Sequence, residues 1–264
     1  MLVHTFGQQG AIVRTEGMAT AFMRAAIRRI VGGEYPVSSL IPTESELGAE
    51  FGVSRTVIRE GTKVLSDKGL LRSQRGRGTE VLPAAQWRAF DSDVLAARLE
   101  VGDRDVVLRE VLILRRCIEQ EIAASAARSN DVEARARLKD CFARLEAARN
   151  DPERYKVIDD EFHRKLGELG GIALLGDVLA VLGLPIRIQR DLTGRIPGGN
   201  PNMSHEQHDA VYQAVMNRDA AAARAAMEHH LSWAEDRLDH VLVDSPAKAG
   251  SLRRSRSPSG PGRV

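Results

Sequence analysis

The sequence predicts a mainly α-helical protein in two parts, an N-terminal winged helix-turn-helix followed by an all-α helical bundle. Two observations predict this fold. Near the N-terminus, three stretches with helical spacing of apolar residues precede two short β-like runs around a glycine-bearing turn, the order found in a winged helix-turn-helix. From residue 91 to about residue 243, nearly every stretch repeats its apolar residues with a helical period instead.

Composition supports helices and leaves the partner open. The 264 residues suffice for two domains with separate cores, and 4% aromatic residues beside frequent Ala, Leu, Arg and Glu favour helices. With a net charge of +2, any nucleic-acid surface must come from local clustering. No apolar run approaches the ~18 residues of a membrane span and no signal peptide opens the chain, so we expect a soluble, cytoplasmic protein without a membrane partner. Cys117 and Cys141 form no C-x-x-C pair and are expected to be buried in a reducing compartment.

The expected DNA-binding domain covers residues 18–83. Residues 1–17 show no apolar period, so we expect a disordered extension or an over-extended start of the chain. The first helix begins at Met18 and stops at the Gly and Pro of "GGEYP". In the second helix, "PTESELGAEFG", Thr43 is a good N-cap and Glu46 completes a capping box.

The third helix, "VSRTVIREGTKVLSDKG", is the candidate recognition helix. Ser54 can cap its start, and Gly69 stops it. The tight "FGVS" turn before it suits two helices that meet at a steep angle, with the second in the major groove of DNA. The runs "LLRSQ" and "TEVL" then flank "RGRG" as a hairpin, the wing, and we expect residues 84–91 to form a linker.

The remaining helices are expected to form one domain over residues 92–243. Breaks fall at "SND", "NDP", "GG" and "GRIPGGNPN", and Pro185 should kink the fifth helix. The expected helical spans are 91–99, 104–128, 131–149, 152–169, 172–193, 204–217 and 219–242. Residues 244–264 are mostly Ser, Arg, Pro and Gly, so we expect a disordered basic tail.

Basic and hydroxyl side chains gather at the start of the recognition helix and at the tip of the wing. An Arg fork can read guanine, Ser and Thr can reach phosphates, and Gly lets backbone approach backbone. Any one of these arginines alone is more simply a solvated surface charge, but the whole set favours DNA binding. The candidate DNA-binding residues are Ser54, Arg55, Thr56, Arg59, Arg75, Gly76 and Arg77.

Metal-ligand residues converge in the second part of the chain. His208 lies ten residues before Arg218, in the "NRD" turn, and His230 lies twelve residues after it. In an antiparallel helical hairpin both are then about 15–18 Å from the turn and side by side. Asp159 and His163 are four residues apart, so they share one face of an earlier helix beside its apolar stripe.

Four inward groups of this kind predict a divalent metal site, because each would cost several kcal/mol if buried unpaired. Three imidazoles and a carboxylate suit zinc, which we favour, and also nickel or manganese. A single inward histidine is more often a hydrogen-bonded core residue, which is our expectation for His205 and His229, although His205 is placed to substitute for His208.

Three histidines on zinc with an open position also describe hydrolytic sites, so a metal-dependent hydrolase-like enzyme fused to a DNA-binding domain is the alternative. The sequence shows no nucleophile motif and no further inward pair that supplies a general base. An attached DNA reader favours sensing. We therefore expect no catalytic residues and no enzymatic activity. A purely architectural DNA-binding protein would not need buried metal ligands.

The stretch "LIPTESELGAEFGVSRTVIREGTKVLSDKGLLRSQRGRGTEV" is very similar to the DNA-binding domain of the GntR family of bacterial transcription regulators. The resemblance implies that Arg55 and Arg59 read bases, that Ser54 and Thr56 hold phosphates and that Gly76 belongs to the wing. Two positions depart from the family: Ser45 stands where a basic residue is common, and Gly61 where Ala is usual. The glycine should cost the recognition helix about 1 kcal/mol.

The following helices resemble the FCD effector domain of the FadR-like branch of that family. The stretches that carry this resemblance are "LRRCIEQEIAASAA", "DDEFHRKL" and "EQHDAVYQAV…DAAAARAAMEHHL". It implies a divalent cation at Asp159, His163, His208 and His230, and an effector pocket at Arg115. From the residues alone, Arg115 is equally well placed for an ion pair with Glu119, one turn later. "GG" at 170–171 replaces a usual "GN", so a pocket-side amide is absent.

Together these features predict a ligand-responsive, homodimeric repressor of a catabolic operon, because two DNA readers match a two-fold operator. The expected effector is a small carboxylate that completes the metal coordination. The stretch "QWRAFDSDVLAARL" resembles a segment of relatives that sense sugar acids such as galactonate or gluconate, so we expect a sugar acid rather than an acyl thioester.

Overall fold

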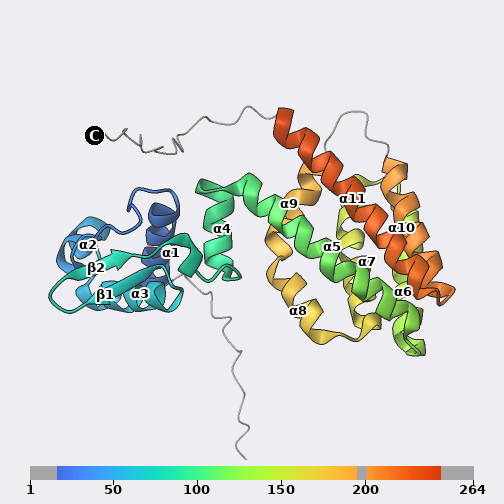
Figure 1. The fold of residues 1–264 in the computed structure, drawn as a ribbon, viewed down its shortest axis with the longest axis horizontal. Coiled ribbons are helices and arrows are strands. Elements are labelled where there is room, and N and C mark those ends of the chain that lie inside the picture. Colours follow the sequence, from blue (N-terminus) through green and yellow to red (C-terminus); the bar gives the residue numbers. More distant parts are fainter. Residues whose placement is uncertain (1–16, 195–200, 245–264) are drawn as a thin grey trace, which may run out of the picture.

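The predicted mainly α fold is confirmed, with a winged helix-turn-helix domain beside a helical bundle (Figure 1). The structure is a computed structural model that describes residues 17–194 and 201–244. The expectations for residues 1–16 and 245–264 lie outside the described residues. No helix within the described ranges is long and apolar enough to cross a membrane.

The N-terminal domain follows the order expected from the sequence. Its elements are α1 (Met18–Val31), α2 (Glu44–Phe51), α3 (Arg55–Asp67), β1 (Leu71–Gln74) and β2 (Gly78–Val81). The capping box of α2 is present, because the Glu46 carboxylate accepts from the Thr43 N–H at 2.8 Å and the Thr43 hydroxyl accepts from the Glu46 N–H at 3.4 Å. The antiparallel strands pair Leu71 with Val81 and Gln74 with Gly78, so the wing is a short two-stranded hairpin.

The segment between the domains is packed rather than extended. It contains a short 3-10 turn (Ala84–Gln86), and the Trp87 indole donates to the Leu82 carbonyl at 2.9 Å. Helix α4 (Ser92–Val101) follows, with Asp91 as its N-cap. The Lys68 ammonium, at the C-cap of the recognition helix α3, lies 2.6 Å from the Asp91 carboxylate and 3.0 Å from that of Asp93. The recognition helix is therefore joined to the start of α4.

Helix α4 belongs to both hydrophobic cores. Val94 and Ala97 pack with the winged-helix core, whereas Leu95 and Leu99 pack with α5, α9 and α11 of the bundle. One helix thus holds the two domains together through its opposite faces.

The bundle contains the remaining helices, and a large core cluster lies between α5, α6, α7, α10 and α11. The helices are α5 (Arg104–Arg128), α6 (Val132–Ala147), α7 (Pro152–Gly170), α8 (Ala173–Val181), α9 (Gly183–Gly194), α10 (Pro201–Met216) and α11 (Ala220–Asp244). The prediction of a single helix over 172–193 was wrong, because the chain forms two helices there, α8 and α9, which are separated at Leu182. Pro185 lies in the first turn of α9, where its missing N–H costs nothing. Cys141 is buried as expected, but Cys117 is exposed on α5.

Gly61 has a packing role that its helix propensity does not reveal. It is buried in α3, and a Cβ there would lie 2.4 Å from Cδ1 of the Phe22 ring. Phe22 is itself only 3% exposed and packs in the core of the domain. The glycine therefore makes room for an aromatic ring, and its cost in helix propensity is offset by that packing.

We expect Gly61→Ala to destabilise the protein by about 1–2 kcal/mol, because the clash with Phe22 outweighs a helix-propensity gain of about 1 kcal/mol. Urea unfolding of wild type, Gly61→Ala, Phe22→Leu and the double variant gives the coupling free energy. In the Phe22→Leu background the alanine should be tolerated or stabilising. Additive effects of the two substitutions would contradict this packing account.

Candidate metal centre and nucleic-acid interface

Three helices bring the metal-type side chains together in the bundle. Asp159 and His163 lie on α7, His208 on α10 and His230 on α11. The turn between α10 and α11 is set by Arg218, which takes a left-handed φ of 60°, and the bundle holds the two helices as a hairpin. The imidazole centroids of His208 and His230 are consequently 4.4 Å apart.

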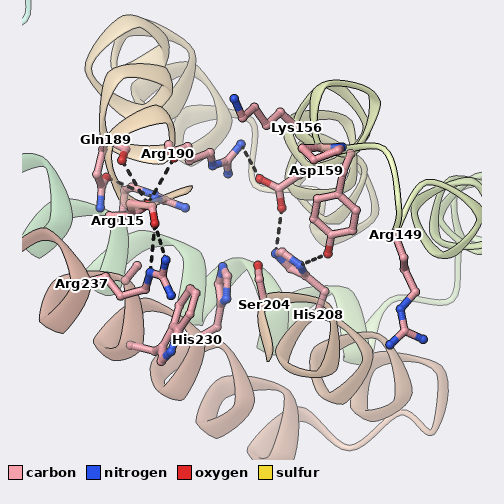
Figure 2. A pocket seen from close by; sticks show the side chains of 15 residues that line it. Arg115, Arg149, Lys156, Asp159, Gln189, Arg190, Ser204, His208, His230 and Arg237 are labelled. Atoms are coloured by element: carbon pink, nitrogen blue, oxygen red, sulfur yellow. Dashed lines mark hydrogen bonds and ion pairs between the residues drawn. The ribbon is translucent and has the colours of Figure 1, made fainter. Parts of the chain in front are cut away.

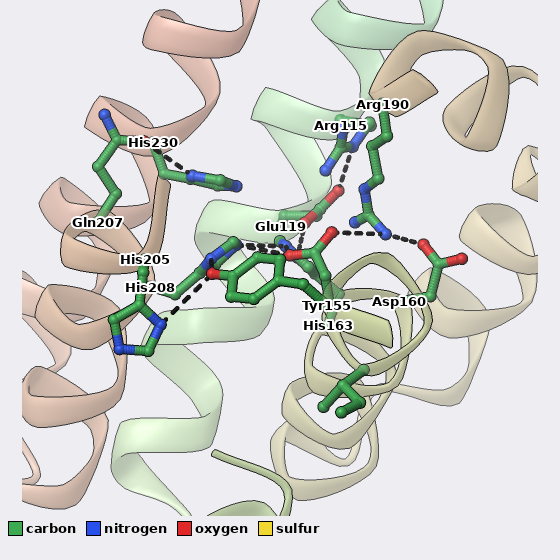
Figure 3. A network of polar contacts seen from close by, with 12 residues as sticks. Arg115, Glu119, Tyr155, Asp160, His163, Arg190, His205, Gln207, His208 and His230 are labelled. Atoms are coloured by element: carbon green, nitrogen blue, oxygen red, sulfur yellow. Dashed lines mark hydrogen bonds and ion pairs between the residues drawn. The ribbon is translucent and has the colours of Figure 1, made fainter. Parts of the chain in front are cut away.

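The imidazoles of His163, His208 and His230 each offer one nitrogen to a group whose members all lie within 4.8 Å of one another (Figure 3). Nε2 of His163 is 3.4 Å from Nε2 of His208. The Asp159 carboxylate lies at the edge of this group, with Oδ1 2.8 Å from His208 Nε2 and 3.8 Å from His163 Nε2. All four residues that the sequence singled out are therefore neighbours in space.

The other ring nitrogen of each histidine faces a second residue. His163 Nδ1 is 2.5 Å from the Glu119 carboxylate, His208 Nδ1 is 3.0 Å from the Tyr155 hydroxyl, and His230 Nδ1 is 3.1 Å from the Gln207 amide oxygen. All three partners can accept a hydrogen bond from an Nδ1–H group. The Nδ1 atoms of His208 and His230 form such a contact, whereas that of His163 has no hydrogen-bond partner among the described residues. If each Nδ1 carries the proton, each Nε2 keeps a lone pair, which is the form of histidine that binds a metal.

The charges of the group also suit a cation. Oδ1 of the buried Asp159 has no hydrogen-bond partner among the described residues, although His208 Nε2 is close. Burial alone raises the pKa of Asp159, but Arg190 and His208 outweigh it and hold that pKa well below its ordinary value. Burial lowers the pKa of His208 and, more strongly, that of His230. The lowered pKa values of this carboxyl and of these two imidazoles favour the deprotonated forms that bind a metal.

A cavity of about 170 Å³ opens beside this group (Figure 2). Asp159, His208 and His230 line one side. Basic side chains dominate the rest of the lining, namely Arg115, Arg149, Lys156, Arg190 and Arg237. With one carboxylate against these cations, the cavity is suited to an anionic ligand.

Arg115 combines the two roles that its position in the sequence left open. Its Nε donates to the Glu119 carboxylate at 2.6 Å, and its Nη1 donates to the Gln189 amide oxygen at 3.3 Å. Arg115 is only 2% exposed and also lines the cavity. Its Nη2 and the Nε2 of Gln189 are buried donors without an acceptor among the described residues. Two such donors at one cavity indicate a place for ligand oxygens.

Several neighbours of the site were not found from the sequence. Glu119 was considered only as a partner of Arg115. Tyr155 was not considered, although it lies four residues before Asp159 and its helical spacing therefore placed it on the same face. Gln189 and Gln207 carried no signal, because their partners come from other helices. His205 does not join the metal-type group; its ring stacks on Phe142 with centroids 5.6 Å apart.

The candidate DNA-binding residues lie on an exposed surface of the winged helix. Ser54 is the N-cap of α3 and accepts from the Val57 N–H at 3.3 Å. The exposed Arg55 donates to the Ser45 hydroxyl at 3.1 Å, so the serine that departs from the family positions this arginine. Thr56 and Arg59 are exposed on the same helix.

The wing residues Arg75, Gly76 and Arg77 form the exposed turn between β1 and β2. Gly76 has a φ of 77°, a conformation that glycine adopts without strain. The Arg77 N–H donates to the Gln74 carbonyl at 3.0 Å and closes the turn. The wing therefore presents its two arginines at the tip of the hairpin.

Comparison with known proteins agrees with both parts of the fold. The family of bacterial regulatory proteins of the gntR type matches residues 24–81, and the FCD domain matches residues 110–232. These are the DNA-binding and effector domains of a class of bacterial transcription regulators. The chain belongs to the GntR family, in its FadR-like branch.

Individual relatives are regulators too. The chain is 29% identical to the galactonate operon transcriptional repressor of Escherichia coli K12, over 81% of this chain and 93% of the relative. It is 32% identical to the HTH-type transcriptional regulator YieP of the same organism, over 54% of this chain and 63% of that protein. The solved structure of Lar, which controls the Listeria monocytogenes agr system, has a TM-score of 0.51 at 15% identity, covers 86% and 99% of the two chains, and shows the fold alone.

These matches decide between the two functions that the sequence left open. The families and the relatives are transcriptional regulators and not enzymes, so the expectation of a non-enzymatic regulator is confirmed. They give no support to the hydrolase alternative. The protein is a DNA-binding transcription regulator of the GntR family.

Proposed function

We propose that this regulator is a homodimeric repressor of a catabolic operon that senses a small carboxylate, a sugar acid, at a divalent metal ion. The observation that carries the proposal is the group of three histidines beside Asp159, each with its Nδ1 close to a polar side chain, next to a cavity whose lining includes five cationic side chains. Four protein ligands would leave a position open to ligand oxygens on a metal ion that accepts five or six donors.

The residues present fit a metal ion. Ligands about 2.0–2.1 Å from zinc in a tetrahedral arrangement lie about 3.3 Å apart, and the Nε2 atoms of His163 and His208 are 3.4 Å apart. A cation also accounts for the Asp159 Oδ1 that lacks a hydrogen-bond partner in the described part of the chain. We assign Asp159, His163, His208 and His230 as the metal ligands. Zinc is the ion we favour, and nickel and manganese accept the same donors.

The cavity favours a small acid that carries further oxygens. A carboxylate suits both the cationic lining and the metal. Hydroxyl or second carboxylate oxygens would satisfy the unpartnered donors of Arg115 and Gln189. A cavity of about 170 Å³ suits a sugar acid better than a long acyl thioester. The relative that represses a galactonate operon supports this class of ligand.

Helix α9 connects the cavity to the DNA reader. It carries Gln189 and Arg190 in the cavity. Its residue Ile186, together with Leu182 just before the helix, belongs to the core that also holds Leu95 and Leu99 of α4. The opposite face of α4 packs in the winged-helix domain. A ligand that binds differently to two positions of α9 would therefore bias the placement of the DNA-binding domain. This gives the effector a physical route to the operator.

In the DNA interface we assign base reading to Arg55 and Arg59, and phosphate contacts to the wing arginines. Arg55→Ala and Arg59→Ala should each cost about 1–3 kcal/mol of specific binding. Arg77→Ala should weaken binding evenly across sequences and reduce the salt slope by about one. Fluorescence titration with operator and scrambled DNA at two salt concentrations measures both effects.

The matched control for these titrations is Arg104→Ala, an exposed arginine on the bundle, which should bind like wild type. Operator candidates are obtained by selection from random DNA with the purified protein. Unchanged specific affinity in both the Arg55 and the Arg59 variants would remove the base-reading assignment.

Chelation should lower the melting temperature of wild type, because an ion that binds only the folded state stabilises it by mass action. The His208→Ala, His230→Ala double variant should show almost no response to chelator. His205→Ala is the matched control: it removes a buried histidine outside the group and should retain the full response. Elemental analysis of protein purified without chelator should find about one metal ion per chain. Metal-free wild type would contradict the assignment.

Calorimetry with a panel of sugar acids, hydroxy acids and dicarboxylates should identify one class that binds and releases operator DNA. Arg115→Lys keeps the charge but loses the fork, and Gln189→Leu removes the amide; each should weaken binding about tenfold or more, in line with about 1.5–3 kcal/mol for a hydrogen bond to a charged group. Arg116→Ala, outside the cavity lining, is the control. Binding that survives both metal removal and Arg115 substitution would refute the carboxylate mechanism.

A further inference from the structure

Helix α8 carries an apolar stripe on its outer face. None of its residues is buried, and its only charged residue is Asp177. Leu174 is 76% exposed, Val181 41% and Leu184, at the start of α9, 39%. Leu174 and Val181 are seven residues apart on α8, and Leu184 follows three residues later on α9. Helix α8 lies at the edge of the bundle (Figure 1). A stripe of this kind on a regulator indicates an interaction surface.

A groove of about 780 Å³ runs beside the stripe, between α7 and the α8–α9 pair. Gly167 on α7 and Gly176 on α8 line it, and a Cβ built on either would have no atom within 4 Å. Val157, 69% exposed, lines the same groove. The surface thus combines large exposed apolar side chains with an adjacent open groove that is lined partly by glycines.

We propose that this surface is the dimer interface of the effector domain, and that its occupant is a second copy of the chain. A two-fold interface uses the same patch on both subunits, so the patch must carry both the projecting side chains and the space that receives them. The stripe of Leu174, Val181 and Leu184 beside the α7–α9 groove meets that requirement. The choice of occupant rests on the proposed homodimer.

The charges flanking the stripe are self-complementary as well. Asp177 and Arg187 are both exposed, and neither has an ion-pair partner in the described ranges. Asp177 lies five residues before Leu182 and Arg187 five residues after it, and Leu182 is where the two helices meet. Antiparallel packing about a two-fold axis near that residue places Asp177 opposite the partner's Arg187. The same register sets Leu184 against the small Ala180 of the partner subunit.

This surface adjoins the sensing site. The groove is lined by His163, a member of the metal-type group, and by Glu119 and Arg190, which contact His163 and Asp159. Helix α9 therefore contributes to the cavity, to the groove and, through α4, to the contact with the DNA reader. A dimer joined here would place both effector sites next to the interface.

Sedimentation equilibrium of the full-length chain tests the proposal. Wild type should be dimeric at micromolar concentration, and Leu174→Glu, Val181→Glu together should raise the dimer dissociation constant roughly a hundredfold, as expected for the loss of central apolar contacts. Val132→Glu on α6 is the matched control, since Val132 is 75% exposed but lies outside the groove, and it should remain dimeric.

A charge swap provides a second measurement that leaves the apolar stripe intact. Asp177→Arg and Arg187→Asp should each weaken the dimer about tenfold, and the double variant should recover most of the loss. Circular dichroism melts show whether each variant is folded; if the double glutamate variant unfolds, the charge swap alone decides. A monomeric wild type would refute both the homodimer and this surface. A wild-type dimer that tolerates all of these substitutions would refute the surface alone.

Discussion

The effector domain depends on satisfying a large set of polar groups inside its helical core. Arg115, Glu119, Asp159, His208 and His230 are all nearly buried, where an unpaired charge or imidazole would cost several kcal/mol. They come from α5, α7, α10 and α11, so these helices must keep their relative register for the pairs to form. The polar cluster therefore does more than create a site: it selects one arrangement among the many that an Ala- and Leu-rich bundle offers.

Within that cluster a continuous chain of contacts leads from the cavity to the metal-type group. Arg115 holds Glu119, Glu119 faces His163, and Arg190 holds Asp159 from the other side. Two of the cations that line the cavity, Arg115 and Arg190, are thus also partners of the carboxylates that lie beside the histidines. A ligand that draws either arginine toward itself would change the charge around the imidazoles, so the proposed binding of an effector and of a metal would be coupled through the same side chains.

Local regularities of the chain made much of this predictable. Helical period placed Asp159 with His163, and the length of two helices about the turn at Arg218 placed His208 beside His230. The contacts of Gln189 and Gln207 depend on how distant helices pack, which no single-sequence period reports. The same limit applies to Gly61, which is needed because the Phe22 ring from another helix packs against it. It also applies to Cys117, which lies on the exposed face of its helix. The break at Leu182 was signalled by Gly183 and Pro185 but was read as a kink.

The sharing of α4 between two cores has a consequence for how the protein meets DNA. Its two faces are buried in different domains, and the Lys68 ammonium ties the end of the recognition helix to its first turn. The DNA-binding domain is therefore held rigidly against the effector domain and does not hang from a flexible linker. In a two-fold dimer, this rigid connection would fix the distance between the two recognition helices and their relative rotation about the DNA axis. The number of base pairs between the two operator half-sites would then be part of what the protein recognises.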